Sequence, residues 1–225
     1  DAGGYREIRN PSRLLEAETG AERLRITAGQ RFYFQDQRVV LNESARSAAT
    51  SDALLGVEGR LSDAWALIGL WQYNLDSSQT ERLNAGVRYT PAPGRVFNAT
   101  YTYNRQYFDP IGKQSQLKQF DLSWQLPVNP NWTLLGRWNY SLIDSKTLEA
   151  VAGVEYNADC WALRLVGQRL TTTSQTTTNS IYLQIELNGL ARFGTNPLEL
   201  LRRSVPGYQQ TNDPTVSPRF RDDAF

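Results

Sequence analysis

The side chains that carry most enzyme chemistry are scarce in this sequence. It contains no histidine and a single cysteine, Cys160, among its 225 residues. Without histidine, a chain cannot build a Ser-His-Asp triad, a histidine general base or a histidine-containing zinc site. One cysteine cannot form a disulfide within the chain, and a lone cysteine is often only a small buried apolar residue. We therefore expect neither an enzyme of these classes nor a metal site or other cofactor.

Arginines and carboxylates alternate with apolar residues in several segments. Arg88, Arg137 and Arg164 are suited to phosphate, because a guanidinium group holds phosphate oxygens in a bidentate manner. Three glutamates in the same pattern can balance these charges: Glu149, Glu155 and Glu186. Paired carboxylates also occur in glycosidases, but no substrate motif accompanies them here. For any single arginine, a solvated polar wall is the simpler interpretation.

These side chains belong to segments with a period of two, as expected for strands with one apolar face. Residues 64–75 and 132–142 show the alternation most clearly, and we find no internal repeat beyond this hairpin pattern. Eleven runs are predicted, at residues 11–18, 21–34, 53–61, 64–75, 81–90, 95–107, 117–126, 132–142, 148–157, 160–170 and 179–189. Many match the roughly 9–11 residues with which a tilted strand crosses a bilayer.

The connections between the runs alternate between short turns and longer polar segments. The longer segments are residues 35–52, 76–80, 108–116, 143–147 and 171–178. This alternation, with aromatic residues near the strand ends, is typical of an outer-membrane barrel. The longest apolar stretch, residues 64–71, is too short for a membrane-spanning helix. The predicted fold is all-β, an antiparallel transmembrane β-barrel, and its odd strand number suggests that more strands precede residue 1.

The last part of the chain departs from the strand pattern. Asn196 can cap a short helix that has Pro197 at its first position and runs to about Arg203. We expect an N-terminal overhang at residues 1–10, barrel strands at 11–190, a C-terminal periplasmic segment with the helix at 191–208, and a disordered tail at 209–225.

Three segments resemble one known family. They are TGAERLRITAGQRFYFQDQRV (19–39), VEYNADCWALRLVGQR (154–169) and IELNGLARFGTNPLELLRRSVPGYQ (185–209). From about residue 11 to 209 the chain resembles the barrel domain of the lipopolysaccharide-assembly outer-membrane family, LptD (OstA/Imp). The resemblance implies a very large barrel preceded by a periplasmic jellyroll. It implies that lipopolysaccharide enters the outer leaflet through a lateral gate between the first and last strands.

The resemblance also implies partners and roles. The partners are lipopolysaccharide, an LptE-type lipoprotein plug, periplasmic bridge proteins and the barrel-assembly machinery. Cys160 would form a disulfide with the N-terminal region outside this chain, although the family has two adjacent cysteines where this chain has Asp159 and Cys160. Residues 179–189 would form the gate strand, with these side chains facing the lumen: Tyr182, Gln184, Glu186 and Asn188. Arg88, Arg137 and Arg164 would be basic lumen residues.

The implied location is the Gram-negative outer membrane, with short turns and the C-terminus periplasmic and long loops external. Two other classes of protein fit part of the pattern. A passive porin-type barrel shares everything except the Cys-Trp segment and the Pro-Gly-Tyr ending. A soluble carbohydrate-binding β-sandwich would also place aromatic residues on one face.

Overall fold

The structure is a computed structural model of the whole chain. It describes residues 5–15, 22–33, 52–108, 114–158, 160–172, 176–188 and 190–212. Most of the predicted loop at 35–52, part of the loop at 171–178, and the tail beyond residue 212 lie outside the described residues.

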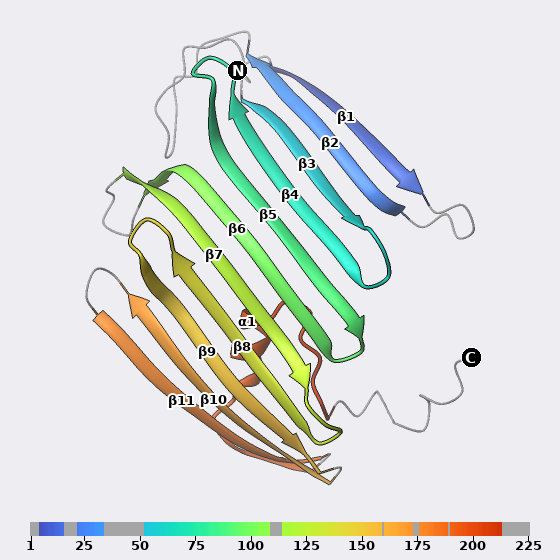
Figure 1. Cartoon of the computed structure of the whole chain (residues 1–225), viewed down its shortest axis with the longest axis vertical. Coiled ribbons are helices and arrows are strands. Elements are labelled where there is room, and N and C mark those ends of the chain that lie inside the picture. Colours follow the sequence, from blue (N-terminus) through green and yellow to red (C-terminus); the bar gives the residue numbers. More distant parts are fainter. Residues whose placement is uncertain are drawn as a thin grey trace. The chain divides into compact units, whose positions relative to one another are not determined.

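The described chain is a single sheet with one short helix (Figure 1). The strands follow one another in sequence order from β1 to β12, and each pair with a defined register is antiparallel. Their bounds are β1 (Tyr5–Leu15), β2 (Glu22–Tyr33), β3 (Ala53–Arg60), β4 (Trp65–Asn74), β5 (Gln79–Ala92), β6 (Arg95–Phe108), β7 (Gln114–Pro127), β8 (Trp132–Ser141), β9 (Lys146–Asn157), β10 (Trp161–Thr172), β11 (Thr176–Leu187) and β12 (Ala191–Gly194). The predicted all-β, antiparallel fold is confirmed.

Two strand predictions differ from the structure. The first strand begins at Tyr5 instead of residue 11, so the expected overhang at 1–10 is largely strand. A twelfth strand, β12, occupies four residues that were assigned to the helical segment. Both were missed for a local reason: β1 is rich in arginine and contains Pro11, and β12 is too short to show a period.

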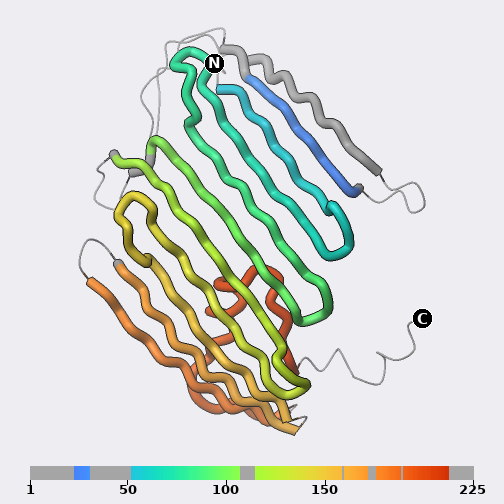
Figure 2. Tube along the Cα trace, in the orientation of Figure 1, coloured from blue at the N-terminus to red at the C-terminus, as the bar shows by residue number. Residues whose placement is uncertain are grey.

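Contacts divide the chain into two compact units. One contains residues 1–87 and 100–118, and the other contains residues 88–99 and 119–225. Strands β1 to β4 belong to the first unit, and β8 to β12 with the helix belong to the second. Figure 2 traces the chain through these elements by residue number.

The hairpin pattern expected from the sequence is repeated in the chain. Residues 65–89 and 132–156 are identical at 12 of 25 positions. In each copy the second tryptophan donates its indole N–H to a threonine hydroxyl at 3.1 Å, Trp71 to Thr80 and Trp138 to Thr147. The turn between the strands has a serine with positive φ in both copies, Ser78 at 52° and Ser145 at 50°. The shared residues therefore fix the same turn twice.

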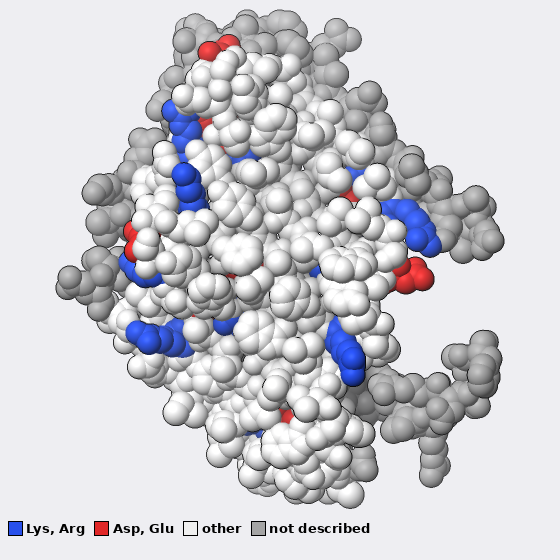
Figure 3. Space-filling model, viewed as in Figure 1, with Lys and Arg blue, Asp and Glu red and all other residues white. Residues whose placement is uncertain are grey.

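One face of the strands is apolar and exposed. Its large exposed side chains include Trp65, Ile68, Leu70, Trp132, Leu134, Leu165, Ile181, Leu183 and Ile185. The face of the molecule shown in Figure 3 is correspondingly mostly free of charge. Among the described residues, no helix is long and apolar enough to span a membrane.

The helix α1 (Leu198–Ser204) lies near the predicted place. The N-cap is Pro197, one residue later than the expected Asn196, and it makes no side-chain capping bond. The side chain of Asn196 still accepts a hydrogen bond from the Leu198 N–H at 3.2 Å. Leu198, Leu200 and Leu201 are buried. Leu200 and Leu201 join a core with Leu135, Val151 and Val166, which are inward residues of β8, β9 and β10. Burial of each leucine contributes about 1.5–3 kcal/mol, so packing holds this short helix in place.

Candidate functional site

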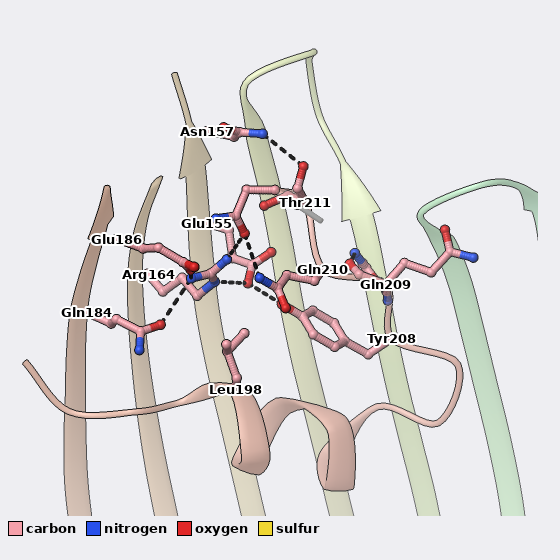
Figure 4. Close-up of polar contacts among 12 residues, drawn as sticks. Glu155, Asn157, Arg164, Gln184, Glu186, Leu198, Tyr208, Gln209, Gln210 and Thr211 are labelled. Carbon is pink, nitrogen blue, oxygen red and sulfur yellow. Dashed lines mark hydrogen bonds and ion pairs between the residues drawn. The ribbon is translucent and has the colours of Figure 1, made fainter. Parts of the chain in front are cut away.

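Arg164 is the centre of a buried polar cluster on the face opposite the exposed apolar one. It lies in β10, and its side chain has no exposed surface. Its Nε donates to Glu155 Oε1 in β9 at 3.0 Å, and its Nη1 donates to Glu186 Oε2 at 2.6 Å and Gln184 Oε1 at 3.0 Å, both in β11. Glu155 and Gln184 are the direct register partners of Arg164 on the two neighbouring strands. One guanidinium group therefore ties three strands together (Figure 4).

The cluster is close to neutral. Glu186 also accepts a hydrogen bond from Arg192 Nε in β12 at 2.8 Å, so two glutamates face two arginines. Burying an ion pair is costly unless its charges are compensated, and here the charges balance although Glu155 Oε2 is buried without a hydrogen-bond partner among the described residues. Both carboxylates are occupied by arginine, which does not suit them to act as a glycosidase acid and nucleophile.

A segment after the helix, residues 205–212, covers this cluster; we call it the C-terminal strap. The phenol O–H of Tyr208 donates a hydrogen bond to Glu155 Oε1 at 2.5 Å, and Asn212 Oδ1 accepts one from Arg164 Nη2. Figure 4 shows Tyr208 and Thr211 reaching the strands that carry Glu155 and Arg164. The strap therefore covers the Arg164 cluster and contributes polar groups that bond to it.

The strap is also bonded to strands further along the sheet of this unit. Gln125 in β7 makes two bonds with the Gln209 backbone, donating to its carbonyl at 2.7 Å and accepting from its N–H at 2.9 Å. Asn98 in β6 donates to the Pro206 carbonyl at 3.0 Å, and Asn157 donates to the Thr211 carbonyl at 2.8 Å. These side chains satisfy backbone N–H and C=O groups of the strap, which is irregular and has no strand partner to bond them.

The phenol O–H of Tyr208 is the hydrogen-bond donor in its contact with Glu155. Its burial, followed by the nearby negative charge of Glu155, raises the pKa of the Tyr208 phenol far above its ordinary value. The raised pKa favours the protonated phenol, the form that donates the hydrogen bond to Glu155.

The three predicted basic residues have different surroundings. Arg137 is held by Asp121 and Glu149, each at 2.8 Å, and Arg164 is enclosed as described. Arg88 is exposed, and its Nε donates to Asn98 Oδ1 at 2.9 Å. The contacts of Arg137 and Arg164 agree with the charge-balanced polar wall. Whether any of the three contacts a phosphate stays a prediction.

Of the four residues predicted to face the lumen from the gate strand, Tyr182, Gln184 and Glu186 share the polar face of β11, and Asn188 follows the end of the strand. Gln184 and Glu186 are buried against Arg164, and Asn188 Oδ1 accepts from Asn212 Nδ2 at 2.7 Å. Tyr182 packs against the core beneath α1. Contacts within the chain therefore already involve all four residues, and their part in a substrate path stays a prediction.

Cys160 lies immediately before β10 and is exposed, with a free thiol. Its carbonyl accepts from the Asn188 N–H at 3.0 Å, so its backbone is held beside the end of β11. Exposure does not fit the alternative of a small buried apolar residue. It leaves the sulfur accessible to a partner outside this chain.

Several residues of the cluster were not found from the sequence. Asn98, Gln125, Tyr208 and Asn212 are joined only because the strap folds back over the sheet. The one sequence signal for this is the polar residues at inward positions 98 and 125, both of which bond to the strap. In the other unit, the carboxylate of Glu81 is nearly buried, and its Oε1 lies 3.3 Å from Arg105 Nη1. The alternation of polar and apolar residues in the sequence did not reveal this ion pair either.

Comparison with known proteins agrees with the fold. Residues 11–132, more than half of the chain, match the family model described as LPS transport system D, LptD. The chain belongs to the LptD family. It is 42% identical over 208 residues to the LPS-assembly protein LptD of Thiobacillus denitrificans, covering 92% of this chain and 27% of that protein.

Two further relatives give the same result. The LPS-assembly protein LptD of Azoarcus sp. is 39% identical over 93% of this chain and 26% of its own length. That of Nitrosomonas eutropha is 41% identical over 89% of this chain and 26% of its own length. The chain thus spans about a quarter of the length of the relatives it matches, while the similarity includes both the strands and most of the C-terminal region.

Proposed function

We propose that this chain is the C-terminal barrel portion of an LptD protein that inserts lipopolysaccharide into the outer leaflet of the outer membrane. The observation that carries the proposal is the similarity of about 40% identity over nine-tenths of the chain to proteins named for lipopolysaccharide assembly. The two faces of the sheet support it. An exposed apolar face suits lipid, and a polar opposite face suits the sugar part of the substrate in a wet lumen.

In this proposal the aromatic side chains mark the two membrane interfaces. At one end of their strands the Tyr156 ring contacts both Trp132 and Trp161, with ring centroids 4.7 and 5.2 Å apart. Trp138 and Tyr140 lie at the other end of β8, 5.4 Å apart. We place the short turns, Cys160 and the C-terminal segment on the periplasmic side, and the long loops outside.

The proposed partners act through the full-length protein. They are an LptE-type lipoprotein plug, periplasmic bridge proteins and the barrel-assembly machinery, and Cys160 would form a disulfide with the N-terminal region. The role is transport without catalysis. The acyl chains would pass into the bilayer beside β11, while the sugar part moves along the polar face at Tyr182 and its neighbours.

A photocrosslinking amino acid at Tyr182 in the full-length protein tests this function. Tyr182 is partly exposed on the polar face of β11, so we expect an adduct with lipopolysaccharide during transport. Val166, the register partner of Tyr182 in β10, is fully buried and serves as the matched control. Adducts at neither Tyr182 nor other partly exposed positions of this face would contradict the proposal.

A further inference from the structure

The two edges of β11 are bonded very differently. On one edge, β10 pairs with β11 along its whole length, from Trp161↔Leu187 to Thr172↔Thr176. On the other edge, β12 pairs only with Gln184–Leu187. Within the part of the chain that the structure describes, no strand pairs with residues 176–182 on that second edge.

The short strand β12 is firmly attached to β11. Thr195 extends the pairing by one residue: its N–H donates to the Leu183 carbonyl at 2.9 Å, and its hydroxyl accepts from the Leu183 N–H at 2.9 Å. Arg192 adds its bond to Glu186, inside the Arg164 cluster. The backbone groups on this part of the edge are therefore already used.

Gly194 makes this close approach possible. Its φ is +94°, which side chains other than glycine rarely adopt. A Cβ atom at this position would overlap the carbonyl oxygen of Leu183. The chain after β12 then continues through the buried Pro197 into α1 and the strap, so both ends of the attachment are fixed.

We propose that β12 is a built-in stop on the last long strand, which confines the barrel seam to residues 176–182 of β11. In a bilayer, a strand edge must have its hydrogen bonds satisfied within the protein. The relatives are more than three times as long as this chain, so the full-length protein has further strands to supply. A further strand can add to the free part of the edge, but it cannot add where β12 already sits.

A shorter seam has fewer backbone hydrogen bonds to break when it opens. Resting on the proposed function, this places the exit of the acyl chains beside residues 176–182, at the end of β11 away from β12. The part of the edge from Leu183 to Leu187 stays closed during transport, because β12 does not leave it.

A disulfide across the stop tests whether it stays closed. Ile185 and Phe193 are register partners, and both are exposed, so Ile185→Cys with Phe193→Cys can be oxidised in the full-length protein. The matched control is Leu165→Cys with Leu183→Cys across β10 and β11, two strands paired along their whole length. We expect oxidation to leave lipopolysaccharide delivery unchanged in both. Loss of delivery only in the Ile185–Phe193 variant, restored by a reductant, would overturn the proposal.

Removing the stop gives a second measurement that does not depend on lipopolysaccharide. Gly194→Val should detach β12 from β11. The entry of a large antibiotic should then rise several-fold, because the edge of β11 at Gln184–Leu187 loses the strand that pairs with it. Gly167→Ala, whose new Cβ would meet only ordinary contacts, should have no effect. Thr195→Ala is a milder variant that removes the two hydrogen bonds of the Thr195 hydroxyl to Leu183 without strain, and it should give a smaller rise. Wild-type permeability in both Gly194→Val and Thr195→Ala would refute the stop.

The two experiments separate the stop from the proposed function. If the wild-type protein delivered no lipopolysaccharide, the function would fail while the permeability of the Gly194 and Thr195 variants still reported on the stop. Oxidising the Ile185–Phe193 pair in the Gly194→Val background should restore low permeability. If thiol labelling shows that the Ile185–Phe193 disulfide has formed and the permeability nevertheless stays high, this result would also count against the stop.

Discussion

Arg164 shows how single residues turn a sheet edge into a rigid unit. Its guanidinium binds groups on β9, β11 and the strap, so the last long strand is connected to its neighbours by side chains as well as by backbone. The same contacts make Arg164 a poor phosphate ligand, because its donors are already occupied. Arg88, which is exposed, is better placed to meet an anionic substrate. Sequence alone could not separate the two arginines, since both lie at inward positions of an alternating strand.

Replacing Arg164 should destabilise the protein strongly. Arg164→Gln leaves Glu155, which is almost fully buried, without its positive partner, and breaking such a pair costs about 3–5 kcal/mol. Arg88→Gln is the matched control and should cost only about 1 kcal/mol, because it loses one partly buried hydrogen bond and no buried ion pair. The measurement is the urea unfolding midpoint of the full-length protein in detergent. Equal midpoints for the two variants would show that the cluster carries no such energy.

At the scale of elements, the strands were predictable and the connections between distant segments were not. A period of two over ten residues leaves few alternatives, and an Asn-Pro pair indicates the start of α1 correctly within one residue. The strap and β12 have no period, because one follows no regular structure and the other is four residues long. Their positions depend on partners such as Gln125 and Leu183, which are far away in sequence.

The repeated hairpin allows a prediction with an internal control. Gly69 and Gly136 occupy the same place in the two copies, but a Cβ at Gly136 would overlap the ring of Trp124, while one at Gly69 would meet Val57 at an ordinary 3.8 Å. Gly136→Ala must displace the ring and should cost about 1–3 kcal/mol. Gly69→Ala should be neutral or slightly stabilising, because it reduces the freedom of the unfolded chain.

Unfolding midpoints of the two glycine variants, measured side by side, test this difference. Trp124→Ala combined with Gly136→Ala should cost less than the sum of the two single changes, because removal of the ring removes the overlap. Additive effects in this double variant would mean that the ring of Trp124 does not decide the result.

At the scale of the whole molecule, the described sheet is open and needs the rest of the protein. Its two outermost strands, β1 and β12, each have one neighbour. A sheet in a bilayer cannot leave such edges free, so closure requires strands beyond those present here. The proposed disulfide of Cys160 is a second connection to the same missing part. It would fix the N-terminal region beside the end of β11, where the Cys160 carbonyl already binds Asn188.

The state of Cys160 in the full-length protein tests this connection. The thiol is exposed and is the only one in this chain, so an oxidising periplasm should join it to a cysteine elsewhere in the protein. A disulfide that closes a long loop makes the denatured chain more compact, so the protein should migrate faster on a non-reducing gel than on a reducing one. Cys160→Ser should abolish that difference, while Ser180→Cys, which adds a thiol without removing this one, should retain it. Equal migration of the wild-type protein on both gels, with Cys160 open to maleimide labelling, would show that the thiol stays free. The N-terminal region would then have to be held by non-covalent contacts alone.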